Sequence, residues 1–209
     1  MHSLTKYIGG HGTSIGGIIV DGGNFDWTKD RKRQPLMNEP DQSYNGAIWA
    51  DAVPKLTGAN IPFAIRARVV LLRDLGAPLS PFNAFQIIQG LETVALRMKQ
   101  HCVNAEKVVS FLETQKKVTN VIYPTNHQGE IKERAKKYMQ GGYGSLVGMD
   151  VGTREAGSKF IDNLKMLYHV ANIGDARSLA IHPATTTHSQ LNDEELLAAG
   201  VTPGYVRLS

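Results

Sequence analysis

Apolar and polar residues recur along this chain with spacings that predict helices and strands in turn. The clearest helix begins after Ser80, which can cap it, and Pro81, which suits the first helical position. From there apolar residues recur three and four positions apart as far as Leu112. This spacing predicts one long amphipathic helix, long enough to belong to two domains. A shorter helix is predicted from Pro62 to about Leu75, ended by the glycine and proline that follow.

Short apolar runs predict strands on both sides of these helices. The run GIIVDGG (17–23) predicts a buried strand, because two glycines close a continuous apolar stretch. Further strands are predicted in VTNVIYP (118–124), SLVGMDV (145–151), residues 178–181 and YVRLS (205–209). Strands that alternate with helices indicate an α/β protein.

Three more helices are predicted among the downstream strands. A charged helix separates 118–124 from 145–151, and another is expected over 157–168. Asn192, with Glu195 three positions later, makes a capping pattern for a last short helix, DEELLAA.

Residues 24–60 show no apolar period. They carry three prolines and several aromatic residues among polar ones. A segment of this length without regular structure predicts a functional loop or an insertion that wraps around the fold.

Composition narrows the class of protein without identifying it. Hydrophobic residues make up 42% of the 209 and charged residues 20%, which is typical of a globular chain. The net charge is +4, and the two basic clusters, KDRKR (29–33) and KERAKK (132–137), each contain an acidic residue. We interpret both clusters as surface, with nucleic-acid binding as the alternative. The single cysteine, Cys102, excludes an intramolecular disulfide and fits a reducing compartment, and no apolar run approaches the length of a membrane span.

The N-terminal stretch HSLTKYIGGHGTSIGG (2–17) holds the strongest candidate chemistry. Hydroxyl residues precede Lys6, and five glycines lie between positions 9 and 17. A nucleotide-hydrolase phosphate loop has the reverse order, with glycines before the lysine and a hydroxyl after it. A dinucleotide fingerprint needs tighter glycine spacing and a preceding strand.

A third kind of site for this stretch is a lysine that forms an imine with a phosphate-bearing aldehyde cofactor. Such a lysine must be neutral to attack a carbonyl, and short hydroxyls would bind the phosphate. Glycines after the lysine would let the backbone turn tightly against the cofactor. Composition alone favours a simpler alternative, an ordinary turn with a surface lysine.

Four segments resemble one family. HSLTKYIGGHG (2–12) resembles the cofactor-lysine segment of the cysteine/methionine-metabolism family of pyridoxal-phosphate enzymes, with its Ser-x-Thr-Lys-Tyr pattern followed by Gly-His. Residues 80–101 resemble the long interdomain helix of that family. Residues 178–191, SLAIHPATTTHSQL, and 200–209, GVTPGYVRLS, resemble two of its later motifs. The motifs occur in the family's order, so the resemblance covers essentially the whole chain.

The resemblance implies a fold and a division into domains. The expected class is α/β, part of a fold-type I pyridoxal-phosphate transferase similar to aspartate aminotransferase. Residues 1–104 would form the C-terminal part of the large cofactor domain, with an insertion at 24–60, and residues 105–209 the small C-terminal domain. The chain resembles the C-terminal half of the family, so we expect both of its ends to lie inside the complete fold.

The resemblance also implies an activity. GGHGTSIGG and the aromatic-rich stretch after it are most similar to the O-acetylhomoserine sulfhydrylase branch. The implied reaction is γ-replacement on O-acetyl-L-homoserine by sulfide or methanethiol, giving homocysteine or methionine and acetate in methionine biosynthesis. The alternatives are cystathionine γ-synthase or methionine γ-lyase activity, and an inactive stand-alone fragment that lacks the other half of the site.

Residue roles follow from the same resemblance. Lys6 would be the catalytic lysine that carries pyridoxal 5′-phosphate, and Ser3 and Thr5 would contact its phosphate. Arg207 would hold the α-carboxylate of the substrate, with Ser178 beside it. Without the family, the simpler interpretations are a hydroxyl pair that caps a turn and a surface ion pair near the end of the chain.

The remaining candidates are expected to be structural. His182 and His188 lack a cysteine or carboxylate that would complete a metal site, so no metal is expected. His11 is expected to fix the glycine turn, and Cys102, on an apolar helix stripe, to pack in the core. The implied partners are the small substrates and further copies of the chain, as a dimer of dimers in the cytoplasm, without nucleic acid or membrane.

Overall fold

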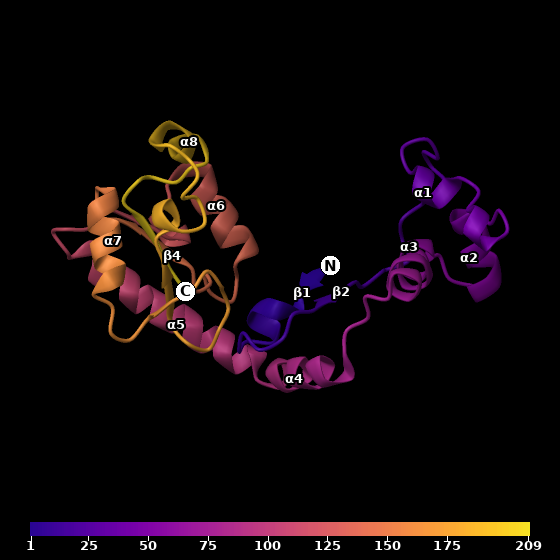
Figure 1. The fold of residues 1–209 in the computed structure, drawn as a ribbon, viewed down its shortest axis with the longest axis horizontal. Helices are drawn as coiled ribbons and strands as arrows, with labels where there is room; N and C mark the ends of the chain where they lie inside the picture. Colours follow the sequence, from indigo (N-terminus) through magenta and orange to yellow (C-terminus); the bar gives the residue numbers. More distant parts are fainter. The chain divides into compact units, whose positions relative to one another are not determined.

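The structure, a computed structural model, describes residues 1–209 and divides into two compact units. The first unit contains Met1–Ser3 and Gly16–Ala84, and the second contains Leu4–Ile15 and Phe85–Ser209. Each unit contains helices and a β-sheet, which confirms the α/β class (Figure 1). None of the helices is long and apolar enough to cross a membrane.

A two-stranded ribbon opens the first unit. Strands β1 (His2–Ser3) and β2 (Gly17–Ile18) pair antiparallel, with Ser3 opposite Gly17. The prediction of a buried strand over 17–23 is therefore wrong: β2 has two residues, both exposed, and Val20 after it is 72% exposed. A ribbon of two short strands is too small to bury an apolar run.

The rest of the first unit is helical. It contains α1 (Pro35–Asn38), the 3₁₀ turn η2 (Gln42–Tyr44), α2 (Trp49–Thr57), α3 (Pro62–Arg66) and the wider helical turns η3 (Ala67–Asp74). The helix predicted from residue 62 to 75 is thus confirmed as α3 and η3 together.

Residues 24–60 are more ordered than their irregular pattern predicts. Met37, Trp49, Ala50 and Val53 form a small buried core, and Trp27 packs against it with other partly buried residues. The helices that carry this core have four to nine residues, too few to show a clear period in the sequence.

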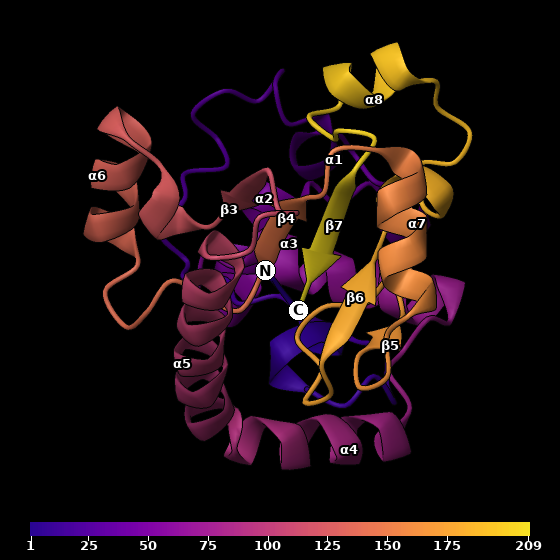
Figure 2. The same cartoon turned by 90° about the vertical axis from the view of Figure 1, so that its left-hand side faces the viewer.

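The helix predicted from residue 81 to 112 is two helices, α4 (Pro81–Glu92) and α5 (Val94–Glu113). The break lies at Thr93, whose backbone (φ −108°, ψ 3°) is not helical. Close to the break, the backbone of Gly90 passes so near that of Gly9 that a Cβ at Gly90 would lie 2.1 Å from the Gly9 carbonyl oxygen. Figure 2 shows the chain turning sharply between the two helices.

A five-stranded sheet in the order β3-β4-β7-β6-β5 organises the second unit. The strands are β3 (Asn120–Ile122), β4 (Val147–Asp150), β5 (Tyr168–His169), β6 (Leu179–Ile181) and β7 (Tyr205–Leu208). Neighbours are antiparallel except β5 and β6, which are parallel. The strands predicted near 118–124, 145–151, 178–181 and 205–209 are confirmed.

Three shorter helices accompany the sheet: α6 (Gly129–Tyr138), α7 (Arg154–Asp162) and α8 (Asp193–Ala198). The charged helix and the Asn192–Glu195 capping box are confirmed. The helix predicted over 157–168 begins earlier, because the Thr153 side chain accepts a hydrogen bond from the Ala156 N–H and caps it. It also ends earlier, at Asp162, and residue 168 lies in β5 instead.

The main core lies between the sheet and two of the helices. Ala105, Val109 and Leu112 of α5 pack with the inward residues of β4 and β7 and with Ile161 of α7. Alternation along β7 buries Val206 and Leu208 on this side, so Arg207 faces the other side of the sheet. The α5 helix runs through residue 104, where the sequence places a domain boundary; that boundary stays a prediction.

Candidate cofactor and substrate site

Lys6 lies in one wide helical turn, η1 (Leu4–Ile8), in the second unit. Its backbone departs from helical geometry (φ −92°, ψ −128°), and the turn is closed by hydrogen bonds from Gly9 N to Leu4 O and from Gly10 N to Lys6 O. Gly10 has φ +72°, which side-chain-bearing residues rarely adopt, so a glycine is needed where the chain leaves the turn.

His11 fixes this turn, as predicted. Its Nδ1 lies 2.8 Å from the Gly9 carbonyl oxygen. The imidazole is therefore engaged locally with the backbone of the glycine-rich segment.

Arg97 holds the same turn from α5. Its guanidinium donates hydrogen bonds to the carbonyl oxygens of Tyr7 (2.8 Å), Ile8 (3.2 Å) and Gly90 (2.6 Å). Burial lowers the pKa of Arg97. Arg97 was not predicted from the sequence, because nothing in the amphipathic pattern of a long helix distinguishes one arginine from the others.

The structure brings Lys6 and Arg207 to a single residue, Asn172. The Lys6 Nζ donates to Asn172 Oδ1 at 2.7 Å, and Arg207 Nη2 donates to the Asn172 carbonyl oxygen at 3.1 Å. Asn172 lies in the loop between β5 and β6 and is half-buried, as are Lys6 and Arg207. Asn172 was not predicted from the sequence, since a loop asparagine 166 positions from the lysine carries no pattern of its own.

One donor of Arg207 has no hydrogen-bond partner within the protein. Arg207 lies on β7 opposite Gly148 of β4 and Ile181 of β6, and this pairing fixes its backbone. Its Nε is buried and has no hydrogen-bond partner in the structure. A buried unpaired donor is unfavourable, and an anionic oxygen would satisfy it.

The loop that carries Asn172 is itself tied to the lysine turn. Gly174 has φ +74°, and a Cβ there would lie 2.5 Å from the Tyr7 nitrogen. The Ala176 N–H donates to the Gly10 carbonyl oxygen at 2.8 Å. Backbone contacts on both sides of the glycine thus hold the loop against η1.

Asp175 anchors the same loop through a charged contact. It is 3% exposed and forms an ion pair with Arg177 at 2.8 Å. The hydrogen bond from the Arg177 side chain is the main reason why the pKa of Asp175 is lowered. The carboxylate also approaches Gly12, where a Cβ would lie 2.7 Å from its Oδ2.

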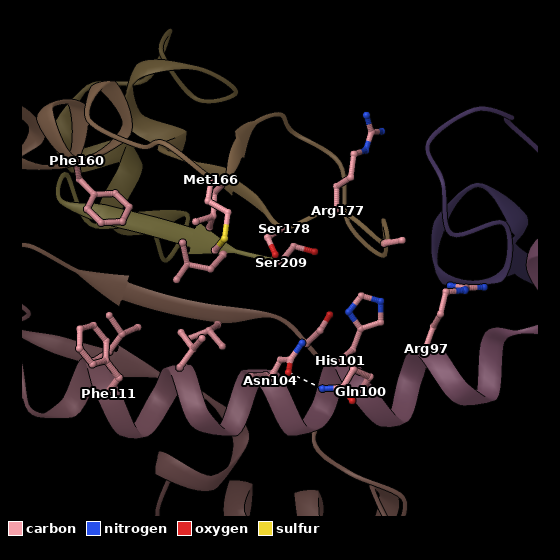
Figure 3. A pocket seen from close by; sticks show the side chains of 18 residues that line it. Arg97, Gln100, His101, Asn104, Phe111, Phe160, Met166, Arg177, Ser178 and Ser209 are labelled. Atoms are coloured by element: carbon pink, nitrogen blue, oxygen red, sulfur yellow. Dashed lines mark hydrogen bonds between the residues drawn. The ribbon is translucent and has the colours of Figure 1, made fainter.

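A separate cavity of about 420 Å³ lies between α5 and the sheet (Figure 3). Its walls are mostly apolar, with Phe111, Phe160 and Met166 among them, and Ser178 and Ser209 belong to the lining. Lys6 and Arg207 do not line this cavity.

The wall nearest the lysine turn contains His101. Its ring meets the Tyr7 ring edge-on, with centroids 5.9 Å apart, and the Tyr7 hydroxyl lies 2.7 Å from Ser145 Oγ. Burial lowers the pKa of His101, and the positive charge of Arg97 acts in the same direction, whereas Asp175 opposes them.

The other predicted site residues make none of the hydrogen bonds that join Lys6, Asn172 and Arg207. Ser3 is exposed on β1 in the first unit, whereas Thr5 lies in η1 beside Lys6. Ser178 is exposed, and its carbonyl oxygen accepts a hydrogen bond from the Tyr168 N–H at 2.9 Å. The roles of these three residues stay predictions.

Of the residues expected to be structural, His182 and Cys102 are buried, whereas His188 is half-buried with its Nδ1 2.9 Å from Thr187 Oγ1. His182 is fully buried, with Nδ1 2.9 Å from Thr185 Oγ1 and Nε2 2.8 Å from the Pro203 carbonyl oxygen. Cys102 is buried on α5, which confirms its place in the core. Residues 1–209 contain no group of three or more side chains placed to hold a metal ion.

Comparison with known proteins gives relatives over the whole chain. It is 51% identical over 214 residues to an O-acetyl-L-homoserine sulfhydrylase of Leptospira meyeri, and 44% identical over 209 residues to a homocysteine synthase of Schizosaccharomyces pombe. Each alignment covers 100% of this chain and 48% of the relative. The chain therefore spans about half the length of the curated relatives it matches.

Solved structures match in the same way. A putative O-acetylhomoserine (thiol)-lyase of Campylobacter jejuni, whose structure contains N′-pyridoxyl-lysine-5′-monophosphate, matches with a TM-score of 0.85 at 40% identity. That match covers 100% of this chain and 48% of the other. The metB protein of Corynebacterium glutamicum matches with a TM-score of 0.69 at 29% identity, over 43% of its chain.

The family model described as Cys/Met metabolism PLP-dependent enzyme matches residues 1–209. Together with the solved structures, this confirms the fold-type I expectation and the resemblance first indicated by the segment around Lys6. The chain belongs to the family of Cys/Met metabolism PLP-dependent enzymes.

Proposed function

We propose that this chain carries the lysine and carboxylate-binding part of a pyridoxal-phosphate-dependent O-acetylhomoserine sulfhydrylase. The reaction is γ-replacement on O-acetyl-L-homoserine by sulfide or methanethiol, giving homocysteine or methionine and acetate, in methionine biosynthesis. The names of the similar proteins, among them an O-acetyl-L-homoserine sulfhydrylase and a homocysteine synthase, support this branch of the family.

One observation supports the proposal most strongly. The Lys6 amine and the Arg207 guanidinium bind the same residue, Asn172, through its side chain and its backbone respectively. An amino acid bound by its carboxylate at Arg207 would thereby lie next to the amine that must act on it. This placement favours a reaction at the carbons adjacent to an amino-acid carboxylate.

The residues around Lys6 fit a pyridoxal-phosphate site. The partner of its Nζ is a neutral amide, and none of the ion pairs in the structure involves Lys6. No carboxylate competes for this amine, so Lys6 is placed to form a bond with the aldehyde carbon of a cofactor. Pyridoxal phosphate, when bound, supplies the electron sink that makes loss of the substrate Cα proton accessible.

Different residues of the chain would bind the cofactor, transfer protons and bind the substrate carboxylate. Lys6 would hold the cofactor and, as a free amine, take protons from Cα and Cβ of the substrate. Arg207 would bind the α-carboxylate through its unpaired Nε and a neighbouring N–H, because the planar guanidinium holds both carboxylate oxygens at once. Ser178 would assist it, and Ser3 and Thr5 would donate hydrogen bonds to the phosphate.

Assembly and location are part of the same proposal. We expect the complete protein to be a cytoplasmic homo-oligomer, a dimer of dimers, whose partners are the small substrates. Size-exclusion chromatography with light scattering measures the oligomer directly.

Reductive trapping tests the role of Lys6. The chain is incubated with pyridoxal phosphate, reduced with borohydride, digested, and mapped by mass spectrometry. We expect the reduced adduct on Lys6, and we expect Lys6→Arg to lose both the yellow colour and the adduct while Lys99→Arg, a substitution on the surface of α5, keeps them. An adduct on a different amine in the unaltered chain would contradict the proposal.

The substrate class is tested by direct assay. The chain is supplied with O-acetylhomoserine and sulfide, or with methionine alone, both by itself and together with the remaining half of the Leptospira meyeri enzyme. Homocysteine from the first pair supports sulfhydrylase activity, whereas breakdown of methionine supports the γ-lyase alternative. A trapped Lys6 with neither product would indicate an inactive fragment.

A further inference from the structure

We propose that Asn172 is a positioning residue for the lysine amine. Its side-chain oxygen holds the Lys6 Nζ whenever that amine carries no bond to a cofactor. Its backbone carbonyl oxygen binds Arg207, which fixes the position of the amine relative to the guanidinium. The role of this contact during turnover rests on the proposed function, whereas the contact itself does not.

The first support is the contact between the two side chains. Oδ1 of Asn172 accepts a hydrogen bond from Lys6 Nζ at 2.7 Å, and both residues are half-buried. A lysine side chain has many rotamers and loses much conformational entropy when it is held in one place. A short hydrogen bond from a fixed acceptor therefore determines where the amine lies.

The second support is the rigidity of the acceptor. The Asn172 carbonyl oxygen is bound by Arg207 at 3.1 Å, and the backbone of Gly174 lies against Tyr7, the residue after the lysine. The Gly174 N–H also donates to Ser209 Oγ at 3.4 Å. The segment that carries Asn172 is thus tied to β7 and to the lysine turn at once.

The third support is the chemistry of an amide in this place. A proton-transferring amine alternates between its neutral and charged forms. A carboxylate beside it would favour the charged form strongly, whereas an amide oxygen accepts a hydrogen bond from either form and carries no charge. An asparagine here can thus orient the amine without suppressing its reactivity.

Competitive labelling of the cofactor-free chain tests the proposal. The chain and its variants react with trace acetic anhydride at pH 8, and mass spectrometry gives the acetylation rate of Lys6 relative to that of exposed Lys99. Asn172→Asp places a negative charge beside the amine, so we expect Lys6 to react about tenfold more slowly. Asn172→Ala removes the acceptor, so we expect it to react about fivefold faster.

The two variants are expected to change the acetylation rate of Lys6 in opposite directions. A general loosening of the structure would instead accelerate labelling in both. If both variants accelerate labelling, or if Asn172→Asp leaves the rate within twofold of the unaltered chain, the proposal is wrong. Asn120→Asp, at an exposed position on β3, is the matched control and should change nothing. If Asn172→Ala does not fold, by far-ultraviolet circular dichroism, the nearly isosteric Asp variant decides alone.

This experiment is independent of the cofactor. The labelling uses no pyridoxal phosphate and measures no turnover. A failure of the reductive trapping therefore leaves the labelling result interpretable, and the reverse is also true.

Discussion

Individual residues in the second unit restrain Lys6, the proposed cofactor lysine, through hydrogen bonds. Arg97 holds the backbone oxygens of Tyr7 and Ile8, which directly follow Lys6, while Asn172 holds the amine. Main-chain carbonyls bound by a charged donor are strongly fixed, because such hydrogen bonds are stronger than neutral ones. The lysine is thus restrained at its backbone and at its tip.

His101 gives a prediction about acidity at this scale. Its pKa is lowered in the folded chain, chiefly by burial, from the ordinary value of 6.5. The unfolded chain then binds this proton more readily, so the free energy of unfolding falls as the pH drops from about 6.5 through the folded-state pKa. We expect His101→Gln to lose less stability than the unaltered chain between pH 7 and pH 5.

Urea unfolding of both proteins at several pH values measures this difference. The other histidines are common to both chains, and their contributions cancel in the comparison. Parallel losses of stability on acidification would mean that His101 titrates alike in both states.

At the scale of elements, two backbones approach closely near the bend in the long helical stretch. Gly90 near the end of α4 lies against Gly9 after the lysine turn, and Arg97 of α5 binds the oxygens of both helix and turn. The bend between α4 and α5 and the position of η1 therefore depend on each other.

Gly90→Ala tests this dependence. Alanine normally stabilises a helix by about 1 kcal/mol over glycine. Here its Cβ would lie 2.1 Å from a backbone oxygen that has no side-chain freedom to move away. We expect a net loss of about 2 kcal/mol in the free energy of unfolding, measured with urea, because overpacking outweighs the helix propensity.

Gly141→Ala is the control for this substitution. A Cβ at Gly141 would meet nothing within 4 Å. Its stability should stay within about 0.5 kcal/mol of the unaltered chain. A neutral or stabilising effect of Gly90→Ala would show that the approach of Gly90 to Gly9 does not exclude a side chain.

At the scale of the whole molecule, each unit has its own buried core. The first unit is built around Met37, Trp49, Ala50 and Val53, and the second around the larger cluster between α5 and the sheet. Stability increases with the apolar area that a core removes from water. The smaller core of the first unit should therefore unfold at a lower denaturant concentration.

The two tryptophans make this prediction measurable. Trp27 and Trp49 both belong to the first unit, so tryptophan fluorescence reports on that unit alone. Far-ultraviolet circular dichroism reports on the helices of both. We expect the fluorescence transition to precede the main dichroism transition in urea; coincident transitions would show that the chain unfolds as one cooperative body.

The local pattern of the sequence was sufficient for most elements of the second unit. The strands near 118–124, 145–151 and 205–209 and the capped helix after Asn192 follow from spacing and cap chemistry, which act between neighbours in the chain. The motif around Lys6 likewise indicated the family, since a short motif keeps its residues together. The predictions that residues 17–23 are buried and that the helix continues beyond Glu92 were wrong. Both features depend on which other segments of the chain pack against these residues.

Only the tertiary structure decided how the site is put together. Lys6 contacts Asn172, and Arg97 binds the Tyr7 carbonyl oxygen, so both contacts join segments that lie far apart in the sequence. The break at Thr93 is likewise absent from the apolar spacing of the helix. The reason is physical: periodicity reports which face of an element is apolar, whereas a hydrogen bond between distant loops leaves no trace in local spacing. The sequence by itself determined most of the elements and indicated Lys6 as the candidate cofactor lysine, and packing determined which residues surround that lysine.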